Sequence, residues 1–212
     1  MSVRNLFEAA ADRYDEGAQE SRYVGPRWLE GQLQGLPPVN RVLDLGCANG
    51  ALGSVIRRRY PNAELVGIDV SPRMVAAAKQ KDIYNELYVA DLEQPLAVSS
   101  EPRFDLAVAL GFLEFLVEPA KLLVQVWRAM CPQGVLFASF QQHWPERPEL
   151  APRRTRSGVV PHHAYTDQEV VAMLTEAGFA VDNVDSKVGY VSRSGFSCPY
   201  LFCRCERVER ET

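Results

Sequence analysis

Three aspartates lie at the ends of three successive β-rich runs of the chain. Asp44 lies in RVLDL, Asp69 in AELVGIDV and Asp91 in ELYVADL. Ligands of open α/β sheets bind at the carboxyl ends of the strands, so these side chains are expected to surround one ligand. Carboxylates accept hydrogen bonds and repel anions. The ligand is therefore predicted to be rich in hydrogen-bond donors and poor in phosphate.

The turn after Asp44, in VLDLGCANGALG, supports the same conclusion. A dinucleotide loop GxGxxG would need glycine at positions 46, 48 and 51, whereas this chain has Gly46, Ala48 and Ala51. Asp69 is placed to accept from both hydroxyls of a ribose, and Asp91 from an exocyclic amine such as that of adenine. Taken singly, such a glycine only makes a turn and such an aspartate only caps a helix. Together they predict an adenosine with a cationic tail.

The β-rich runs alternate with helical patterns. Ser71 and the proline after it predict a helix start in PRMVAAAKQ, and Pro119 begins an apolar helix that CPQG ends. Thr166 and Glu169 have capping-box spacing before a helix that Gly178 ends. The β-rich runs are RVLDL, AELVGIDV, ELYVADL, FDLAVAL, GVLFASF, FAVDNVD and PYLFCRCERV. This alternation predicts a mainly parallel sheet with helices on both faces.

Composition narrows the class of protein. The chain has 212 residues, of which 47% are hydrophobic and 24% charged, with a formal net charge of -4. These values fit one soluble domain and give no basic surface for nucleic acid. No run reaches the roughly 18 apolar residues that span a membrane, and no signal-peptide pattern is found, so a cytoplasmic protein without membrane contact is expected. The five cysteines are expected to be structural thiols, with no metal site.

The segment from Val39 to Phe140 resembles the class I S-adenosylmethionine-dependent methyltransferases in the order and spacing of its motifs. VLDLGCANG is similar to the family's first motif and ELVGIDVSPRMVAAA to its second. ADLEQPL and FDLAVALGFLEFL are similar to the next two, and LLVQVWRAMCPQGVLFASF to the segment leading into the fifth strand. The resemblance implies a Rossmann-like, doubly wound α/β fold with a seven-stranded, mostly parallel sheet, helices on both faces and an antiparallel C-terminal strand.

The resemblance also implies how the chain is organised. A single methyltransferase domain is expected over residues 1–212. Its expected parts are an N-terminal helical cap over 1–38, a cofactor-binding core over 39–140, a substrate lid over 141–164, and a C-terminal helix and strands over 165–212.

S-adenosylmethionine is the cofactor that the resemblance implies, with S-adenosylhomocysteine as the product. Asp44 and the loop after it would surround the methionine portion, Asp69 would hold the ribose and Asp91 would contact the adenine. Two departures from the family are Ala48, in place of the middle glycine, and Phe115, where many relatives carry histidine. The expected cofactor-binding residues are Tyr14, Asp44, Gly46, Cys47, Ala48, Gly50, Asp69, Val70, Met74, Asp91, Leu92, Leu110 and Gly111.

Methyl transfer from a sulfonium is an in-line displacement that depends on alignment and exclusion of water. A base helps only when the acceptor must lose a proton. The candidates for a base or an acceptor-orienting group are His162, His163 and Tyr165, because histidine titrates near neutrality and the segment leads into the helix near Thr166. The alternative is that these histidines, like His143, are solvent-exposed or capping residues.

Other residues are candidates for the acceptor side. The lid arginines predict either a clamp for a carboxylate or phosphate of the acceptor or a solvated loop. Residues near the lid and after the fourth strand, most of them aromatic, would form a wall of the acceptor site or belong to the core. The arginines are Arg147, Arg153, Arg154 and Arg156, and the wall candidates are Phe112, Glu114, Phe115, Phe140 and Trp144.

These observations predict a methyltransferase that acts on an oxygen, nitrogen or carbon atom of a small-molecule metabolite, as a monomer or homodimer. One alternative is a non-catalytic or regulatory subunit that binds S-adenosylmethionine. Another is a protein or RNA methyltransferase, although the chain reads ALGF where an NPPY-type motif would stand.

Overall fold

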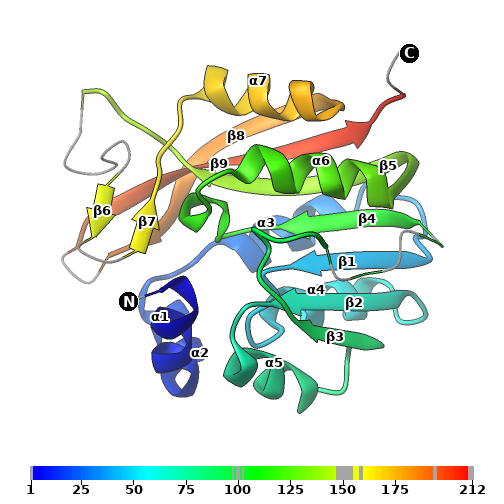
Figure 1. Ribbon diagram of the computed structural model, residues 1–212, viewed down its shortest axis with the longest axis horizontal. Helices are drawn as coiled ribbons and strands as arrows, with labels where there is room; N and C mark the ends of the chain where they lie inside the picture. The colour runs from blue at the N-terminus through cyan, green and yellow to red at the C-terminus, as the bar shows by residue number, and fades with distance from the viewer. Residues whose placement is uncertain are drawn as a thin grey trace.

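The computed structural model spans the whole chain, and the structure describes residues 2–96, 98, 101, 103–146, 155–157, 160–192 and 195–209. A seven-stranded sheet with the strand order β3-β2-β1-β4-β5-β9-β8 forms its centre (Figure 1). Its strands are β1 (Arg41–Leu45), β2 (Glu64–Asp69), β3 (Glu86–Val89), β4 (Phe104–Ala109), β5 (Met130–Gln141), β8 (Phe179–Val191) and β9 (Ser197–Arg207). The strands from β3 to β5 pair in parallel, whereas β9 is antiparallel to both β5 and β8. The predicted fold class is confirmed.

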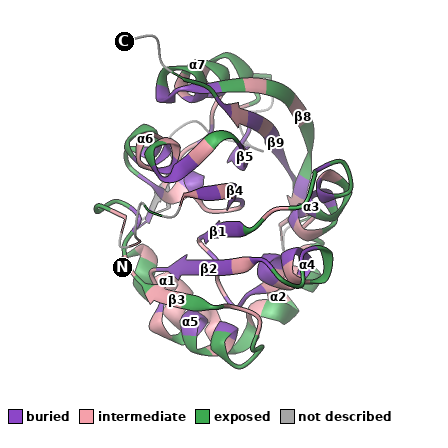
Figure 2. Cartoon of the chain, turned by 90° about the vertical axis from the view of Figure 1, so that its right-hand side faces the viewer, coloured by how far each residue is buried: buried purple, intermediate pink, exposed green. Residues whose placement is uncertain are grey.

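Helices cover both faces of the sheet. In one core cluster α3 and α4 pack on the sheet, and in the other α6 and α7 do so, so the two pairs lie on opposite faces. Figure 2 shows the buried strands between them. The helices are α1 (Val3–Ala10), α2 (Tyr14–Glu20), α3 (Gly25–Leu33), α4 (Ala51–Arg59), α5 (Pro72–Lys79), α6 (Pro119–Ala129) and α7 (Asp167–Ala177), with 3-10 turns η1 (Ala11–Arg13) and η2 (Leu113–Phe115).

The capping signals of the sequence are confirmed. Ser71 accepts a hydrogen bond from the backbone of Met74 at the start of α5, at 3.2 Å. Thr166 and Glu169 form the reciprocal capping box of α7, and Gly178 ends that helix with a φ of 103°. These signals are local, because each depends on residues only three or four positions apart.

The structure differs in one respect from the predicted helix stop at CPQG. Helix α6 ends at Ala129 as expected, but CPQG then lies inside the bounds of β5. The pairing of β4 with β5 begins at Phe104 and Met130, shifts register, and resumes at Leu106 and Val135. The four residues therefore act as an irregularity at the start of the strand rather than as a separate turn.

The predicted lid over 141–164 is described in part, and it returns toward the carboxyl ends of the strands. Strands β6 (Thr155–Ser157) and β7 (Val160–His162), which were not expected, form a small antiparallel pair. His143 donates its backbone N–H to the carbonyl of Tyr165 at 2.8 Å. His163 donates its own to the carbonyl of Glu114, also at 2.8 Å, which ties the segment to η2.

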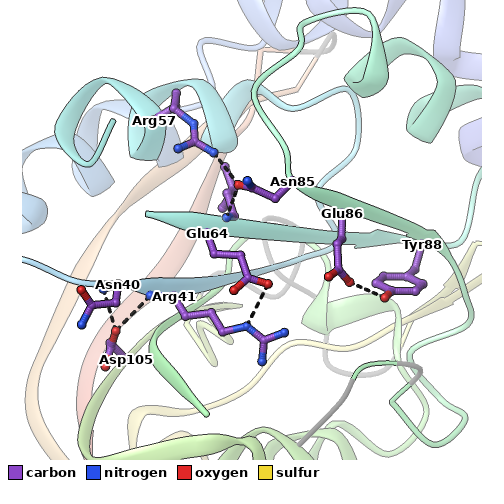
Figure 3. Close-up of polar contacts among 9 residues, drawn as sticks. Asn40, Arg41, Arg57, Glu64, Asn85, Glu86, Tyr88 and Asp105 are labelled. Atoms are coloured by element: carbon purple, nitrogen blue, oxygen red, sulfur yellow. Dashed lines mark hydrogen bonds and ion pairs between the residues drawn. The ribbon is translucent and has the colours of Figure 1, made fainter. Parts of the chain in front are cut away.

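The amino ends of the parallel strands carry a separate set of polar contacts (Figure 3). Asp105 accepts from the backbone N–H groups of Asn40 and Arg41 at 2.7 and 2.9 Å. The guanidinium of Arg41 pairs with Glu64 at 3.2 Å. Because these polar groups pair with one another, this end of the sheet serves to join strands.

Candidate active site

Two adjoining cavities lie at the carboxyl ends of the strands. One, of about 490 Å³, has Asp69 and Asp91 on its wall, and we call it the Asp69 chamber. The other, of about 500 Å³, has Glu114, Tyr190 and Tyr200 on its wall, and we call it the Glu114 chamber. The residues that line both chambers are Phe7, Tyr14, Gly46, Ala48, Leu110, Gly111 and Phe115. Each chamber is large enough for a small organic group, and the two meet at the loop after β1.

The loop after β1 can adopt its path only with residues that tolerate left-handed backbone. Gly46, Ala48 and Gly50 have φ values of 64, 45 and 83°. A Cβ atom at Gly46 would lie 2.5 Å from Cδ1 of Phe112, so that glycine permits close packing as well. Ala48 adopts the same backbone region at the cost of local strain, because its Cβ crowds the backbone there. The loop thus turns sharply between the two chambers.

Asp69 is the best-positioned carboxylate of the site. Its Oδ2 accepts from the backbone N–H of Ala48 and its Oδ1 from that of Ser71, each at 2.9 Å. The side chain is 8% exposed, and burial raises the pKa of its carboxyl although these N–H groups lower it. Each oxygen keeps a lone pair for a ligand. This geometry suits recognition of two neighbouring hydroxyl groups.

Asp91 and Asp44 occupy different environments. Asp91 lies just beyond β3, is exposed, and accepts from the backbone N–H of Glu93 at 3.0 Å while lining the Asp69 chamber. Asp44 is fully buried, and its Oδ2 accepts from the hydroxyl of Tyr84 at 2.6 Å. Burial raises the pKa of Asp44 to about 7. Asp44 is absent from the walls of both chambers.

The N-terminal helices cover the two chambers. Figure 1 shows α1 and α2 at one end of the sheet, the end from which η2 also projects. Glu8 of α1 accepts from the backbone N–H of Arg73 at 3.0 Å, and the Arg73 guanidinium donates to the carbonyl of Glu8 at 2.9 Å. Asn49, in the loop after β1, donates to Asp15 of α2 at 2.6 Å. These contacts hold the helices over both openings.

Tyr14 belongs to this cover and lines both chambers. Its pKa is raised to about 12, mainly by burial and then by the nearby negative charge of Asp69 and Glu114. The phenol therefore stays protonated and can donate a hydrogen bond throughout the physiological range.

Glu114 is the titratable group buried deepest in its chamber. Its side chain is 1% exposed, Oε1 accepts from the hydroxyl of Tyr200, and Oε2 is buried without a hydrogen-bond partner among the described residues. Burial raises the pKa of its carboxyl to about 7, partly offset by the Tyr200 hydroxyl. The carboxyl is therefore able to exchange a proton near neutral pH.

The structure places most of the expected cofactor residues on the chamber walls. The Asp69 chamber contains Tyr14, Gly46, Ala48, Asp69, Val70, Asp91, Leu92, Leu110 and Gly111. Cys47 is on the wall of the Glu114 chamber. Three expected residues are outside both walls: Asp44, Gly50, which precedes α4, and Met74, which is fully buried in α5.

The three candidate catalytic residues lie outside both walls. The ring of His162 stacks on Phe115 at 5.4 Å and its Nε2 bonds to the side chain of Gln141. Burial lowers the pKa of His162. Tyr165 packs edge-on against Phe140 at 5.7 Å. Both chamber walls include Phe115 and neither includes His162, His163 or Tyr165, so a catalytic role for these three residues stays a prediction.

Some of the remaining acceptor-side candidates lie on a chamber wall and others do not. Phe112, Glu114 and Phe115 are on chamber walls, as expected. Phe140 is fully buried in the core and Trp144 is 38% exposed. Arg147, Arg153 and Arg154, and the side chain of Arg156, lie outside the described residues, so the predicted clamp stays a prediction.

Among the wall residues that carried no sequence signal are three tyrosines, Tyr23, Tyr190 and Tyr200. Tyr23 reaches the site because Val24 donates its backbone N–H to the carbonyl of Gly189, at 2.9 Å, next to Tyr190. Tyr200 comes from β9 and bonds to Glu114, which is 86 positions away in the chain. An isolated tyrosine in a β-rich run is as typical of a core as of a site.

Comparisons with known proteins agree with this geometry. Residues 43–136 match a family model described as a methyltransferase domain. A trans-aconitate 2-methyltransferase of Escherichia coli is 31% identical over 159 residues, which are 69% of this chain and 59% of that protein. The chain thus spans about 59% of the length of the curated relatives it matches.

Solved structures show the same fold at low sequence identity. A methyltransferase of Haloferax volcanii, in complex with the activator Trm112, matches with a TM-score of 0.77 and 16% identity over 99% of each chain. The Burkholderia thailandensis enzyme 1,6-didemethyltoxoflavin-N1-methyltransferase has a TM-score of 0.74 and 17% identity, over 98% of this chain and 88% of that one. That structure contains its small-molecule substrate and S-adenosylhomocysteine. S-adenosylhomocysteine in that structure is the product form of the cofactor that the sequence analysis expects.

Two observations on membranes and metals apply to the described residues alone. No helix among them is long and apolar enough to cross a membrane. They also contain no group of three or more histidine, cysteine, aspartate or glutamate side chains arranged to hold a metal ion.

Proposed function

Because this chain carries a methyltransferase domain of the class I S-adenosylmethionine-dependent family, we propose that it transfers a methyl group from S-adenosylmethionine to a small molecule. The observation that carries the proposal is the pair of chambers. The Asp69 chamber would take the adenosine, with Asp69 on the ribose and Asp91 near the adenine. The Glu114 chamber would take the methionine portion and the acceptor.

The shared walls support a position for the reacting atoms. The loop that contains Gly46 and Ala48 lies between the chambers. A cofactor that extends across it would present its sulfonium near Tyr14 and Phe115. Alignment of the acceptor, methyl carbon and sulfur, with water excluded by α1 and α2, would supply most of the rate. When bound, the cofactor supplies the activated methyl group.

Support for a small-molecule acceptor comes from the size of the Glu114 chamber and from the relatives. A space of about 500 Å³ lined in part by α1 and α2 accommodates a metabolite rather than a folded partner. The Escherichia coli and Burkholderia thailandensis proteins are also each named for a small molecule, trans-aconitate and 1,6-didemethyltoxoflavin.

Calorimetry on Asp69→Asn tests the cofactor part of this proposal. Asparagine keeps one carbonyl oxygen but replaces the second acceptor with a donor. We expect S-adenosylhomocysteine affinity to fall at least about tenfold, because hydrogen bonds to charged groups contribute about 1.5–3 kcal/mol. The matched control is Asp105→Asn, since Asp105 also accepts from backbone N–H groups but at the opposite end of the sheet. Equal affinity losses in both variants would count against the assignment.

Activity is tested by the release of S-adenosylhomocysteine when the protein is mixed with S-adenosylmethionine and a metabolite pool. Release above the background without the pool supports catalysis. Cofactor binding without release from any small-molecule, protein or RNA fraction would favour the non-catalytic alternative.

A further inference from the structure

The Glu114 chamber has an unusual distribution of charge. Among the described residues of its wall, the charged ones are Glu114 and Arg13. The Arg13 side chain is 70% exposed and its Nε pairs with Glu16 at 2.9 Å, so this cation lies at the rim and is already neutralised. Glu114 is 1% exposed. The chamber therefore has a buried carboxyl group on its wall, and no described residue of the wall supplies a buried cation to pair with it.

The hydrogen bonding of Glu114 is incomplete. Tyr200 donates to Oε1, which leaves Oε2 buried and without a partner among the described residues. A buried acceptor that lacks a donor is unfavourable, so such an oxygen on a residue that lines a cavity is suited to a ligand that supplies the donor.

Aromatic rings surround this carboxyl group. Tyr14, Tyr23, Tyr190 and Tyr200 all line the chamber, and the rings of Tyr190 and Tyr200 pack 5.8 Å apart. Phenol rings attract cations through their π faces, and a carboxylate forms its strongest hydrogen bonds with charged donors. An ammonium group matches both features, whereas a carboxylate would be repelled.

We propose that the Glu114 chamber selects a methyl acceptor that carries an amino group, and that this group donates as an ammonium to Oε2 of Glu114. The inference rests on the methyltransferase function proposed above and names its substrate class. It separates this protein from the Escherichia coli relative, which is named for trans-aconitate. A polycarboxylate would place like charges beside the buried carboxyl of Glu114.

The experiment uses two probes of the same shape and opposite charge. Phenethylamine and hydrocinnamate share a phenyl ring on a two-carbon chain and differ in the ammonium or carboxylate at its end. Their affinities are measured by calorimetry on the full chain saturated with S-adenosylhomocysteine, with trans-aconitate as a third probe. We expect phenethylamine to bind at least tenfold more tightly than either anion.

Variants then assign the preference to Glu114. Glu114→Gln is expected to lower phenethylamine affinity at least tenfold while the affinity for methylthioadenosine, which lacks the amino acid portion of the cofactor, stays within twofold. The matched control is Glu20→Gln, which removes the same charge from the exposed side of α2. It is expected to change neither affinity. The wild-type comparison of the probes stands alone if Glu114→Gln does not fold.

Several results would overturn the proposal. These are no phenethylamine binding, equal or tighter binding of an anion, and phenethylamine binding that survives Glu114→Gln. A variant that loses S-adenosylhomocysteine affinity but keeps methylthioadenosine affinity would show that Glu114 holds the amino group of the cofactor instead. Failure of the wild type to bind S-adenosylhomocysteine at all would overturn the proposed function, and this inference with it.

Discussion

The buried carboxyl of Glu114 should leave a measurable signature in the pH dependence of stability. Burial raises its pKa from 4.5 to about 7 in the folded protein. Between these values the folded state binds more protons than the unfolded state, so the free energy of unfolding falls as pH rises. The carboxyl is protonated in both states below this range and ionised in both above it. The destabilisation is therefore complete above about pH 7.

Glu114→Gln removes this ionisation and keeps an oxygen that can accept from Tyr200. The two pKa values predict that the variant gains about 2 kcal/mol of unfolding free energy relative to wild type between about pH 5.5 and pH 8.5. Asp44, whose pKa is also raised to about 7, is present in both proteins and cancels from the difference.

Urea denaturation of both proteins at the two pH values measures this change. Glu20→Gln is the control, because Glu20 is exposed on α2. Its difference from wild type should be the same at both pH values. A Glu114→Gln difference that does not change with pH would refute the assignment of a desolvated, ionisable carboxyl to this position.

Three other predictions concern the loop after β1 and the N-terminal cover. Gly46→Ala should destabilise the fold by about 1–3 kcal/mol, because its Cβ would lie 2.5 Å from Phe112 Cδ1, and Phe112→Ala should partly restore urea stability in the double variant. Ala48→Gly should raise the unfolding free energy by up to about 1 kcal/mol, because it relieves a φ of 45°, whereas Ala76→Gly at an exposed position inside α5 should lower it. No gain from Ala48→Gly would show that the loop is unstrained. Glu8→Ala should accelerate tryptic cleavage within α1 and η1, because the Glu8 carboxylate accepts from the Ser71 hydroxyl and the Arg73 backbone N–H and so ties α1 to α5. Unchanged cleavage would indicate that other contacts hold the cover.

The fold was predictable because its signals are local and repeated. Ser71, Thr166, Glu169 and Gly178 specify helix ends within a few residues, and the structure confirms each of them. The CPQG segment was harder, because a helix stop and an irregular strand start use the same residue types.

Residues of the site could be predicted from the sequence only where they lie next to the ends of strands. Asp69 and Asp91 follow this rule and lie on the chamber wall. Asp44 also ends a strand, but Tyr84 covers it with a hydrogen bond, which no spacing rule anticipates. The pairing of Tyr200 with Glu114 depends on β9 returning beside β5, so it requires the tertiary structure.

The predicted catalytic histidines illustrate the same limit. The ring of His162 stacks on Phe115, which lines both chambers, but His162 itself is on neither wall. Histidine type and position in a loop indicated a base, whereas the direction of the side chain depends on the β6–β7 pair and on Gln141.

The central claim is that the Asp69 chamber and the Glu114 chamber together receive a nucleoside with a sulfonium tail rather than a dinucleotide. Isothermal calorimetry of the wild-type chain with S-adenosylmethionine, S-adenosylhomocysteine and NAD tests it directly. The account predicts saturable binding of the first two and none of NAD. Tight NAD binding without either sulfur nucleoside would contradict it.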